Sequence, residues 1–179
     1  GSHSSDAPLE DSSQLRLFLS GDVMTGQGID QILPHPGDPQ LREPFVKNAN
    51  RYVELAEAVN GPIPYPVEYA YIWGDSIAEL ECMAPDVRIM NLETAVTNCS
   101  DYWRAKKIHY RMNPENAPYL TAAEIDCCAL ANNHILDWGY EGMVETLETL
   151  ESVGMKYAGA VRNRQETQQP AVFEVEDKG

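Results

Sequence analysis

Three short polar clusters carry the residue types in this sequence that could do chemistry, and each directly follows an apolar run. They are Gly21-Asp22, Asn91-Leu92-Glu93 and Ala131-Asn132-Asn133-His134. Carboxylate and amide oxygens together with an imidazole form a donor set suited to a divalent cation that activates water or phosphate. The sequence therefore indicates a candidate cation site formed by Asp22, Glu93, Asn133 and His134.

Each of these residues also has a simpler interpretation, which the sequence leaves open. An Asp after a strand commonly caps the next helix, so Asp22 could do no more than that. Glu93 could be a solvated strand end, and Asn132-Asn133-His134 could simply form a turn. This segment is still the most informative, because two amides and an imidazole at an abrupt strand exit are costly to bury unless hydrogen-bonded or ligated.

Two further residues lie close enough in the sequence to support the site from behind. Asn132 and Asp137 are candidates for holding the site residues in place. Asp137 could instead cap a helix, with Trp138 packing beside it.

The basic residues after the second cluster also have two interpretations. Lys107 and Arg111, together with Lys106, form a tight group that could contact an anionic substrate or belong to a solvated loop. His109 lies between them on a short predicted strand, and we expect it on an exposed face rather than at the site.

The elements that must position these residues alternate between strands and helices. Apolar patterns predict strands at 15–20, 86–92, 108–112, 125–131, 155–158 and 171–175, and helices at 45–59, 69–83, 113–123 and 140–153. Residues 34–44, rich in Pro, Gly and Asp, predict a surface loop. Such alternation indicates an α/β fold with a largely parallel or mixed sheet. The polar clusters then lie at the carboxyl ends of strands, the edge where open α/β sheets bind ligands.

Composition limits the classes of partner. The chain has 179 residues and a formal net charge of -15, with 13 scattered Lys and Arg residues, which argues against nucleic acid. No apolar run approaches the roughly 20 residues that span a bilayer, so we expect no membrane span and a soluble chain. The four cysteines form no CxxC pair, and we expect free core thiols. Residues 1–14 are interpreted as a tag remnant and a disordered segment.

Four segments, in order and at characteristic spacing, resemble the CapA/PgsA-type capsule-synthesis (PGA_cap) family. They are Gly21-Asp22-Val23-Met24, Asn91-Leu92-Glu93-Thr94, Tyr110-Arg111-Met112-Asn113-Pro114 and Leu130-Ala131-Asn132-Asn133-His134, followed by Asp137 and Gly139. The resemblance covers about residues 15–175, and the Asn-Asn-His segment is its most specific part. One departure is Gln27, where the family often has Arg.

This resemblance implies a metallophosphatase-like (calcineurin-like) layered α/β sandwich, of which residues 15–179 would be the N-terminal portion. By resemblance, Asp22, Glu93 and Asn133 would be ligands of a divalent metal ion, Mn²⁺ or another of Mg²⁺, Zn²⁺ and Fe²⁺. His134 would act as general acid or stabilise charge on the leaving group. The family continues well beyond residue 179, so we expect this chain alone to bind metal weakly and to show little turnover.

Two functions remain open from the sequence. The first is a metal-dependent hydrolase of capsule or poly-γ-glutamate biosynthesis, acting on a phosphoester or on amide bonds of the polymer. The second is a non-catalytic component that binds or exports an anionic polymer within a membrane synthesis complex. We also expect exposed apolar surface that could support a homodimer. The sequence does not distinguish a cytoplasmic full-length protein from one associated with the outer face of a membrane.

Overall fold

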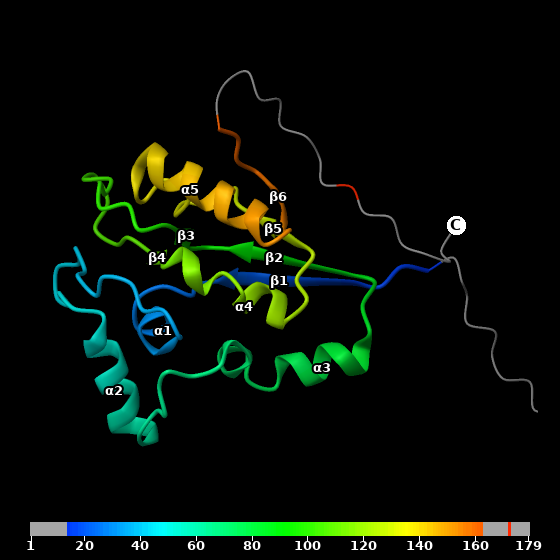
Figure 1. The fold of residues 1–179 in the computed structure, drawn as a ribbon, viewed down its shortest axis with the longest axis horizontal. Helices are drawn as coiled ribbons and strands as arrows, with labels where there is room; N and C mark the ends of the chain where they lie inside the picture. The colour runs from blue at the N-terminus through cyan, green and yellow to red at the C-terminus, as the bar shows by residue number, and fades with distance from the viewer. Residues whose placement is uncertain (1–13, 163–171, 173–179) are drawn as a thin grey trace, which may run out of the picture.

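A four-stranded parallel sheet forms the centre of the computed structural model, which describes residues 14–162 and residue 172 (Figure 1). The strands lie in the order β1-β2-β5-β6, with bounds Leu17–Val23, Val87–Leu92, Cys127–Ala129 and Lys156–Ala158. The predicted α/β fold with a parallel sheet is therefore confirmed. The strand predicted at 171–175 and the segment 1–13 lie outside the described residues.

The register of the sheet brings the carboxyl ends of β1, β2 and β5 together. Asp22 of β1 lies opposite Asn91 of β2, and Asn91 lies opposite Ala129 of β5. The register of β1 shifts between Leu19 and Asp22, as in a β-bulge, and such irregularities bend a strand and re-aim its side chains. The residues that follow all three strands therefore start from one edge of the sheet.

A second, two-stranded sheet lies between this edge and the longest helix. Strands β3 (Ala95–Val96) and β4 (Arg111–Met112) pair in parallel, and helix α5 (Gly139–Ser152) packs against β3. The backbone N–H of Val96 donates to the buried Thr146 hydroxyl at 2.9 Å. This contact ties α5 to β3, and the segment that carries His134 leads directly into that helix.

The remaining helices are short and lie around the sheet (Figure 1). They are α1 (Gly28–Ile32), α2 (Asn50–Asn60), the 3-10 helix η1 (Tyr69–Trp73), α3 (Ser76–Met83), the 3-10 helix η2 (Pro114–Asn116) and α4 (Tyr119–Ala122). The single helix predicted at 69–83 is wrong, because Gly74 takes a φ of 54° and separates η1 from α3. Asn113 caps η2, since its side chain accepts from the Glu115 N–H at 3.1 Å.

The four cysteines differ in their surroundings. Cys127 and Cys128 are buried free thiols, as predicted, and burial raises the pKa of Cys128 to about 12. Cys82 is exposed and Cys99 half-buried, so the prediction of core thiols is wrong for these two. Cys82 lies on α3, and Leu80 is the buried residue of that helix.

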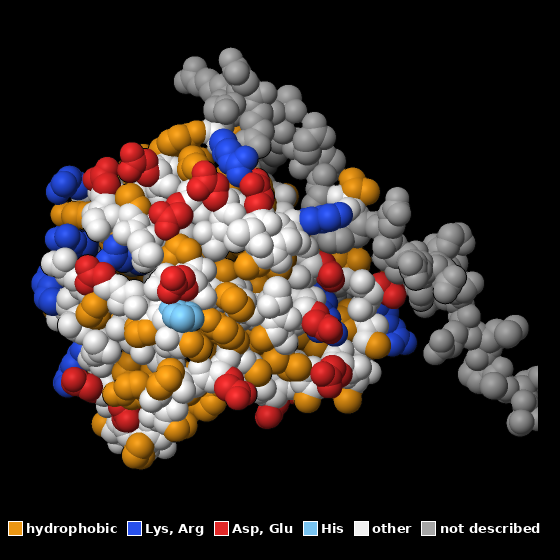
Figure 2. Space-filling view, viewed as in Figure 1, with side chains coloured by type: hydrophobic (Ala, Val, Ile, Leu, Met, Phe, Trp, Pro, Cys, Tyr) orange, Lys and Arg blue, Asp and Glu red, His pale blue; other side chains and the backbone are white. Residues whose placement is uncertain are grey.

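Acidic side chains are spread over the face of the molecule shown in Figure 2, while Lys and Arg lie mainly toward its edges. This distribution agrees with the formal net charge of -15. Among the described residues, no helix combines the length and the apolar character that crossing a membrane requires.

Candidate functional site

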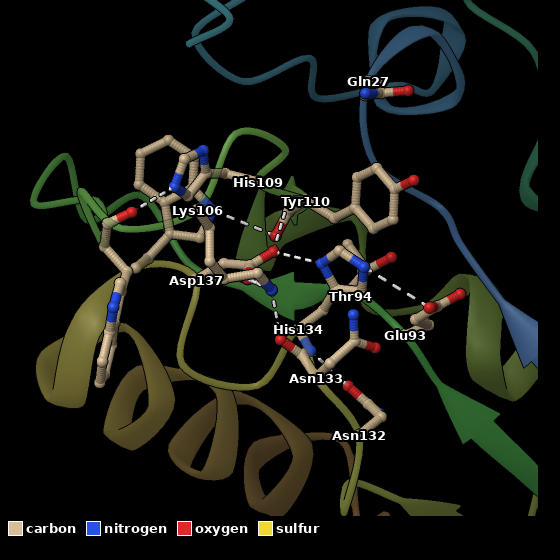
Figure 3. Close-up of polar contacts among 12 residues, drawn as sticks. Gln27, Glu93, Thr94, Lys106, His109, Tyr110, Asn132, Asn133, His134 and Asp137 are labelled. Atoms are coloured by element: carbon tan, nitrogen blue, oxygen red, sulfur yellow. Dashed lines mark hydrogen bonds and ion pairs between the residues drawn. The ribbon is translucent and has the colours of Figure 1, made fainter. Parts of the chain in front are cut away.

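His134 is held in a fixed orientation at the exit of β5. Its side chain is buried, and its Nδ1 lies 2.5 Å from Oδ2 of Asp137, three residues further along the chain. The backbone N–H of His134 donates to the Asn132 side-chain oxygen at 3.0 Å. In Figure 3 the imidazole lies between Asp137 and Glu93, with Nε2 at 3.5 Å from Oε1 of Glu93. A carboxylate that accepts the Nδ1–H leaves Nε2 as the ring atom facing the strand ends.

Asp137 is the centre of this part of the site. Its side chain is 0% exposed, and Oδ2 also accepts the Tyr110 backbone N–H at 2.9 Å. Lys106 donates its ammonium to Oδ1 of Asp137 and to the backbone oxygen of Asn133 (Figure 3). A buried carboxylate is tolerated when donors and a counter-charge surround it, as they do here.

The interpretation of Asp137 as a helix cap is wrong. Trp138 occupies the N-cap position of α5, and no side chain caps that helix. The Asp137 carboxylate instead accepts from Lys106, Tyr110 and His134. It therefore holds His134 in the way the sequence suggested for a supporting residue.

Tyr110 covers the face of the His134 ring and was not identified from the sequence as a site residue. The two rings stack with centroids 4.1 Å apart. Burial raises the pKa of the Tyr110 phenol, and the negative charges of Glu93, Glu43 and Asp137 add to that effect. Tyr110 therefore stays protonated over the ordinary pH range and provides a neutral wall beside the imidazole.

A chain of side-chain amides links the three strand exits. The Asn91 amide donates to Oδ1 of Asp22, and the Asn132 amide donates to the Asn91 side-chain oxygen at 3.1 Å. The same Asn132 amide donates to the Leu92 backbone oxygen at 2.7 Å. The three predicted clusters therefore lie at one edge of the sheet. Asn91 contacts both Asp22 and Asn132. It belongs to the second polar cluster, but the sequence did not identify it as a site residue.

The candidate metal ligands are less enclosed than His134. Asp22 and Asn133 are exposed, and the Glu93 side chain is one-fifth exposed. Their carboxylate and amide oxygens suit a hard divalent cation in kind. In the described part of the chain, no three or more His, Cys, Asp or Glu side chains form a group that could hold a metal ion. Their role as ligands stays a prediction.

The three basic residues differ in their surroundings, so the solvated-loop interpretation fits Lys107 but not Arg111. The Arg111 guanidinium donates to the Cys99 backbone oxygen at 2.8 Å and stacks 4.1 Å above the Trp138 ring. Burial lowers the pKa of Arg111. Lys106 binds Asp137, while Lys107 is exposed. Substrate binding by Lys107 and Arg111 stays untested.

The expected exposure of His109 is also wrong. Its side chain lies under Trp138, with ring centroids 5.9 Å apart, and the residue is 3% exposed. Nε2 lies 2.6 Å from the Trp103 backbone oxygen. The rings of Tyr102 and Trp138 both contact it edge-on, and a short local pattern does not reveal the contact with Trp138.

The loop after β1 is fixed by a buried carboxylate from the Pro-rich segment. Gln27 takes a φ of 51° and donates its amide to Glu43, which also accepts the Tyr52 hydroxyl at 2.6 Å. That hydrogen bond, with burial, raises the pKa of Tyr52 to about 12. A Cβ on Gly26 would lie 2.7 Å from the Arg111 backbone oxygen, so this position requires glycine. No sequence signal in the Pro-rich segment pointed to Glu43.

Comparisons with known proteins agree with the resemblance seen in the sequence. The family model described as bacterial capsule synthesis protein PGA_cap matches residues 16–179. A Mycobacterium tuberculosis protein named "Probable polyglutamine synthesis accessory protein" is 51% identical over 144 residues, covering 80% of this chain and 38% of the relative. The capsule biosynthesis protein CapA of Bacillus anthracis is 21% identical over 154 residues, covering 86% of this chain and 30% of the relative. The chain thus spans well under half the length of these relatives.

Proposed function

Because the chain belongs to the bacterial capsule synthesis protein PGA_cap family, we propose that the full-length protein is a metal-dependent hydrolase of capsule or poly-γ-glutamate synthesis. The observation that carries this proposal is the orientation of His134 by the buried Asp137. A histidine held by a carboxylate through one ring nitrogen has its other ring nitrogen positioned for general acid-base chemistry. We propose the same metallophosphatase-like layered sandwich as the complete fold.

In this proposal, Asp22, Glu93 and Asn133 contribute oxygen ligands to a divalent metal ion, Mn²⁺ or another of Mg²⁺, Zn²⁺ and Fe²⁺. When bound, the ion supplies Lewis-acid activation of water and of the scissile group. The support comes from the sheet register and from the amide chain that ties Asp22 to the exits of β2 and β5. Ligands beyond these three would come from other parts of the full-length protein.

His134 delivers a proton to the leaving group from Nε2, while its Nδ1–H stays hydrogen-bonded to the Asp137 carboxylate. Lys106 keeps the Asp137 carboxylate compensated inside the protein, and stacking by Tyr110 keeps the ring from turning. The Asn132 side chain fixes the backbone N–H of His134. These contacts position the imidazole before substrate binds, which reduces the ordering cost of the reaction.

The substrate class that fits this chemistry is a phosphoester or the amide bond of an anionic polymer. The competing role, polymer binding or export without turnover, requires a free basic surface. Of the three neighbouring cations, Lys106 and Arg111 are engaged with protein groups and Lys107 is exposed. The contacts therefore favour hydrolysis over electrostatic capture.

The test uses the full-length protein with Mn²⁺, a chromogenic phosphodiester and poly-γ-glutamate as probes. Turnover is measured for the parent and for Asp22→Asn, His134→Gln and Lys107→Ala. We expect the first two substitutions to lower kcat by roughly a hundredfold or more, and Lys107→Ala to leave it within a few-fold. Polymer binding that needs Lys107, with no turnover in the parent, would assign the non-catalytic role instead.

A further inference from the structure

The loop of residues 42–47 carries an exposed aromatic ring between two cations. Phe45 is 96% exposed, and Arg42 and Lys47 on either side of it are exposed as well. The loop is closed by a hydrogen bond of 2.9 Å from the Leu41 backbone N–H to the Lys47 backbone oxygen. Phe45 therefore lies at the outer end of a closed loop, with positive charge beside it.

A second loop, residues 103–108, has the same composition. Trp103 and Ile108 are 48% and 44% exposed. Arg104 and Lys107 lie between them in the sequence and are exposed too. Single exposed apolar residues are common on protein surfaces, but two such loops that combine large apolar side chains with cations indicate an interaction surface.

The two loops contact each other beside the candidate site. The guanidinium groups of Arg42 and Arg104 each lie 4.8 Å from the centre of the Tyr102 ring. Arg104 also donates to the Tyr102 hydroxyl at 3.2 Å. The backbone N–H of Trp103 donates to the backbone oxygen of Asp137 at 2.8 Å. The loops thus form one surface, which is attached to the residue that orients the candidate proton donor.

This surface is basic although the chain as a whole is acidic. Residues 103–108 contain Arg and Lys but no Asp or Glu, and the acidic residue of segment 41–49, Glu43, is buried. Arg51, outside these loops, pairs with Glu54 at 3.0 Å. In Figure 1 both loops lie at the left end of the molecule, where many of the Lys and Arg side chains visible in Figure 2 gather.

We propose that the loops carrying Phe45 and Trp103 dock on the surface of a bilayer that contains anionic phospholipid. Aromatic rings favour the headgroup level of a bilayer, and Lys and Arg beside them are attracted to its negative charge. The formal net charge of -15 does not prevent this contact, because charges further than about 10 Å away are largely screened at 0.1 M salt. Docking places the candidate site beside the bilayer and does not depend on hydrolysis.

Other occupants fit this surface less well. A second copy of the chain would place the same cations against each other. An anionic polymer would pair with Arg104 and Lys107 but would leave the Phe45 ring, which is 96% exposed, without a partner. A bilayer uses both the cations and the apolar side chains.

The test measures co-sedimentation of the 179-residue chain with phosphatidylcholine vesicles, prepared with and without phosphatidylglycerol. The variants are Phe45→Ser, Trp103→Ser and Arg104→Gln. Val59→Ser is the matched apolar control, because Val59 lies on α2 and is 82% exposed. Arg16→Gln is the charge control, because this exposed residue precedes β1 at the end of the strand opposite to the candidate site. Circular dichroism checks that each variant keeps the fold.

We expect the parent to bind vesicles that contain phosphatidylglycerol and to bind phosphatidylcholine alone more weakly. Phe45→Ser and Trp103→Ser should each weaken binding roughly tenfold, because each removes a large apolar side chain from the contact. Arg104→Gln should weaken binding roughly threefold to fivefold. The two control substitutions should leave the affinity within about twofold.

Absence of parent binding to phosphatidylglycerol vesicles would overturn the proposal, and so would equal losses in the variants and the controls. Binding of poly-γ-glutamate that requires Arg104, in a parent that does not bind vesicles, would overturn it too, because a polymer would then be the occupant. In the full-length protein Phe45→Ser should also weaken vesicle binding. An unchanged affinity there would contradict the proposal, since the ring would then lie outside the contact with the bilayer.

Discussion

The exit of β5 and the exit of β1 lie at the same edge of the sheet but are built differently. After β5, Asp137 is fully buried and accepts from His134, Tyr110 and Lys106. At the end of β1, Asp22 is exposed and accepts from Asn91. The difference indicates that His134, the proposed proton donor, is fixed within the described chain, whereas Asp22, a proposed cation ligand, is exposed.

The largest expected effect on stability follows from removing Asp137, the buried acceptor after β5. Asp137→Ala leaves the Lys106 ammonium and the Tyr110 N–H without their buried acceptor, so the free energy of unfolding should fall by about 3 to 5 kcal/mol. Urea unfolding followed by circular dichroism measures it. Asp137→Asn is the control, because it keeps the shape and one acceptor and should cost clearly less. A loss under about 1 kcal/mol for Asp137→Ala would mean that the network does not stabilise the β5 exit.

Removing the counter-charge should have an intermediate effect. Lys106→Met keeps most of the side-chain length but leaves Asp137 with fewer donors, and we expect a loss of about 1 to 3 kcal/mol in the same assay. Lys107→Met is the matched control, since Lys107 is exposed, and it should change stability by less than about 0.5 kcal/mol. Equal effects for the two substitutions would contradict the assignment of Lys106 to Asp137.

A smaller, pH-dependent effect on stability is expected at Tyr52 of α2, which donates to Glu43. The pKa of Tyr52 is raised from its usual value near 10 to about 12, so the folded state retains a proton that the unfolded state loses. This contribution to stability is fully present below about pH 10 and is lost as pH rises through about 12. Tyr52→Phe should cost about 1 kcal/mol at neutral pH and should flatten that part of the profile. An unchanged slope between pH 10 and 12 would show that Glu43 does not hold this proton.

The smallest effect on stability is expected for Asp22, at the end of β1. Asp22→Ala removes an exposed side chain and one hydrogen bond, so the free energy of unfolding should change by no more than about 0.5 kcal/mol. The comparison with Asp137→Ala in one denaturation series tests the contrast directly. If Asp22→Ala lowered the free energy of unfolding as much as Asp137→Ala does, the exits of β1 and β5 would not differ in this way.

The sequence predicted the strand exits and their meeting at one edge, because apolar runs that end in polar clusters are local signals. The pairing of His134 with Asp137 was also accessible, since the two residues are three apart. Strand β5 was predicted at 125–131 but covers Cys127–Ala129, so the prediction was two residues too long at each end.

Long-range partners were not predictable in the same way. Lys106 reaches Asp137 from 31 residues away, and Glu43 reaches Gln27 and Tyr52 from a segment that reads as a simple loop. His109 is buried by Trp138, and Gly74 breaks a continuous helical pattern. In each case tertiary packing, or one backbone angle, overrides the local pattern.

We propose one metal-dependent site in which Asp22, Glu93 and Asn133 hold the cation beside His134. Calorimetric titration of Mn²⁺ into the full-length protein, beside Asp22→Ala and His134→Ala, tests it most directly, with the chain of residues 1–179 as reference. We predict binding to the full-length protein, a loss of roughly tenfold or more in Asp22→Ala, a smaller change in His134→Ala, and weak binding to the shorter chain. Equal Mn²⁺ affinity in Asp22→Ala and the parent would contradict the account.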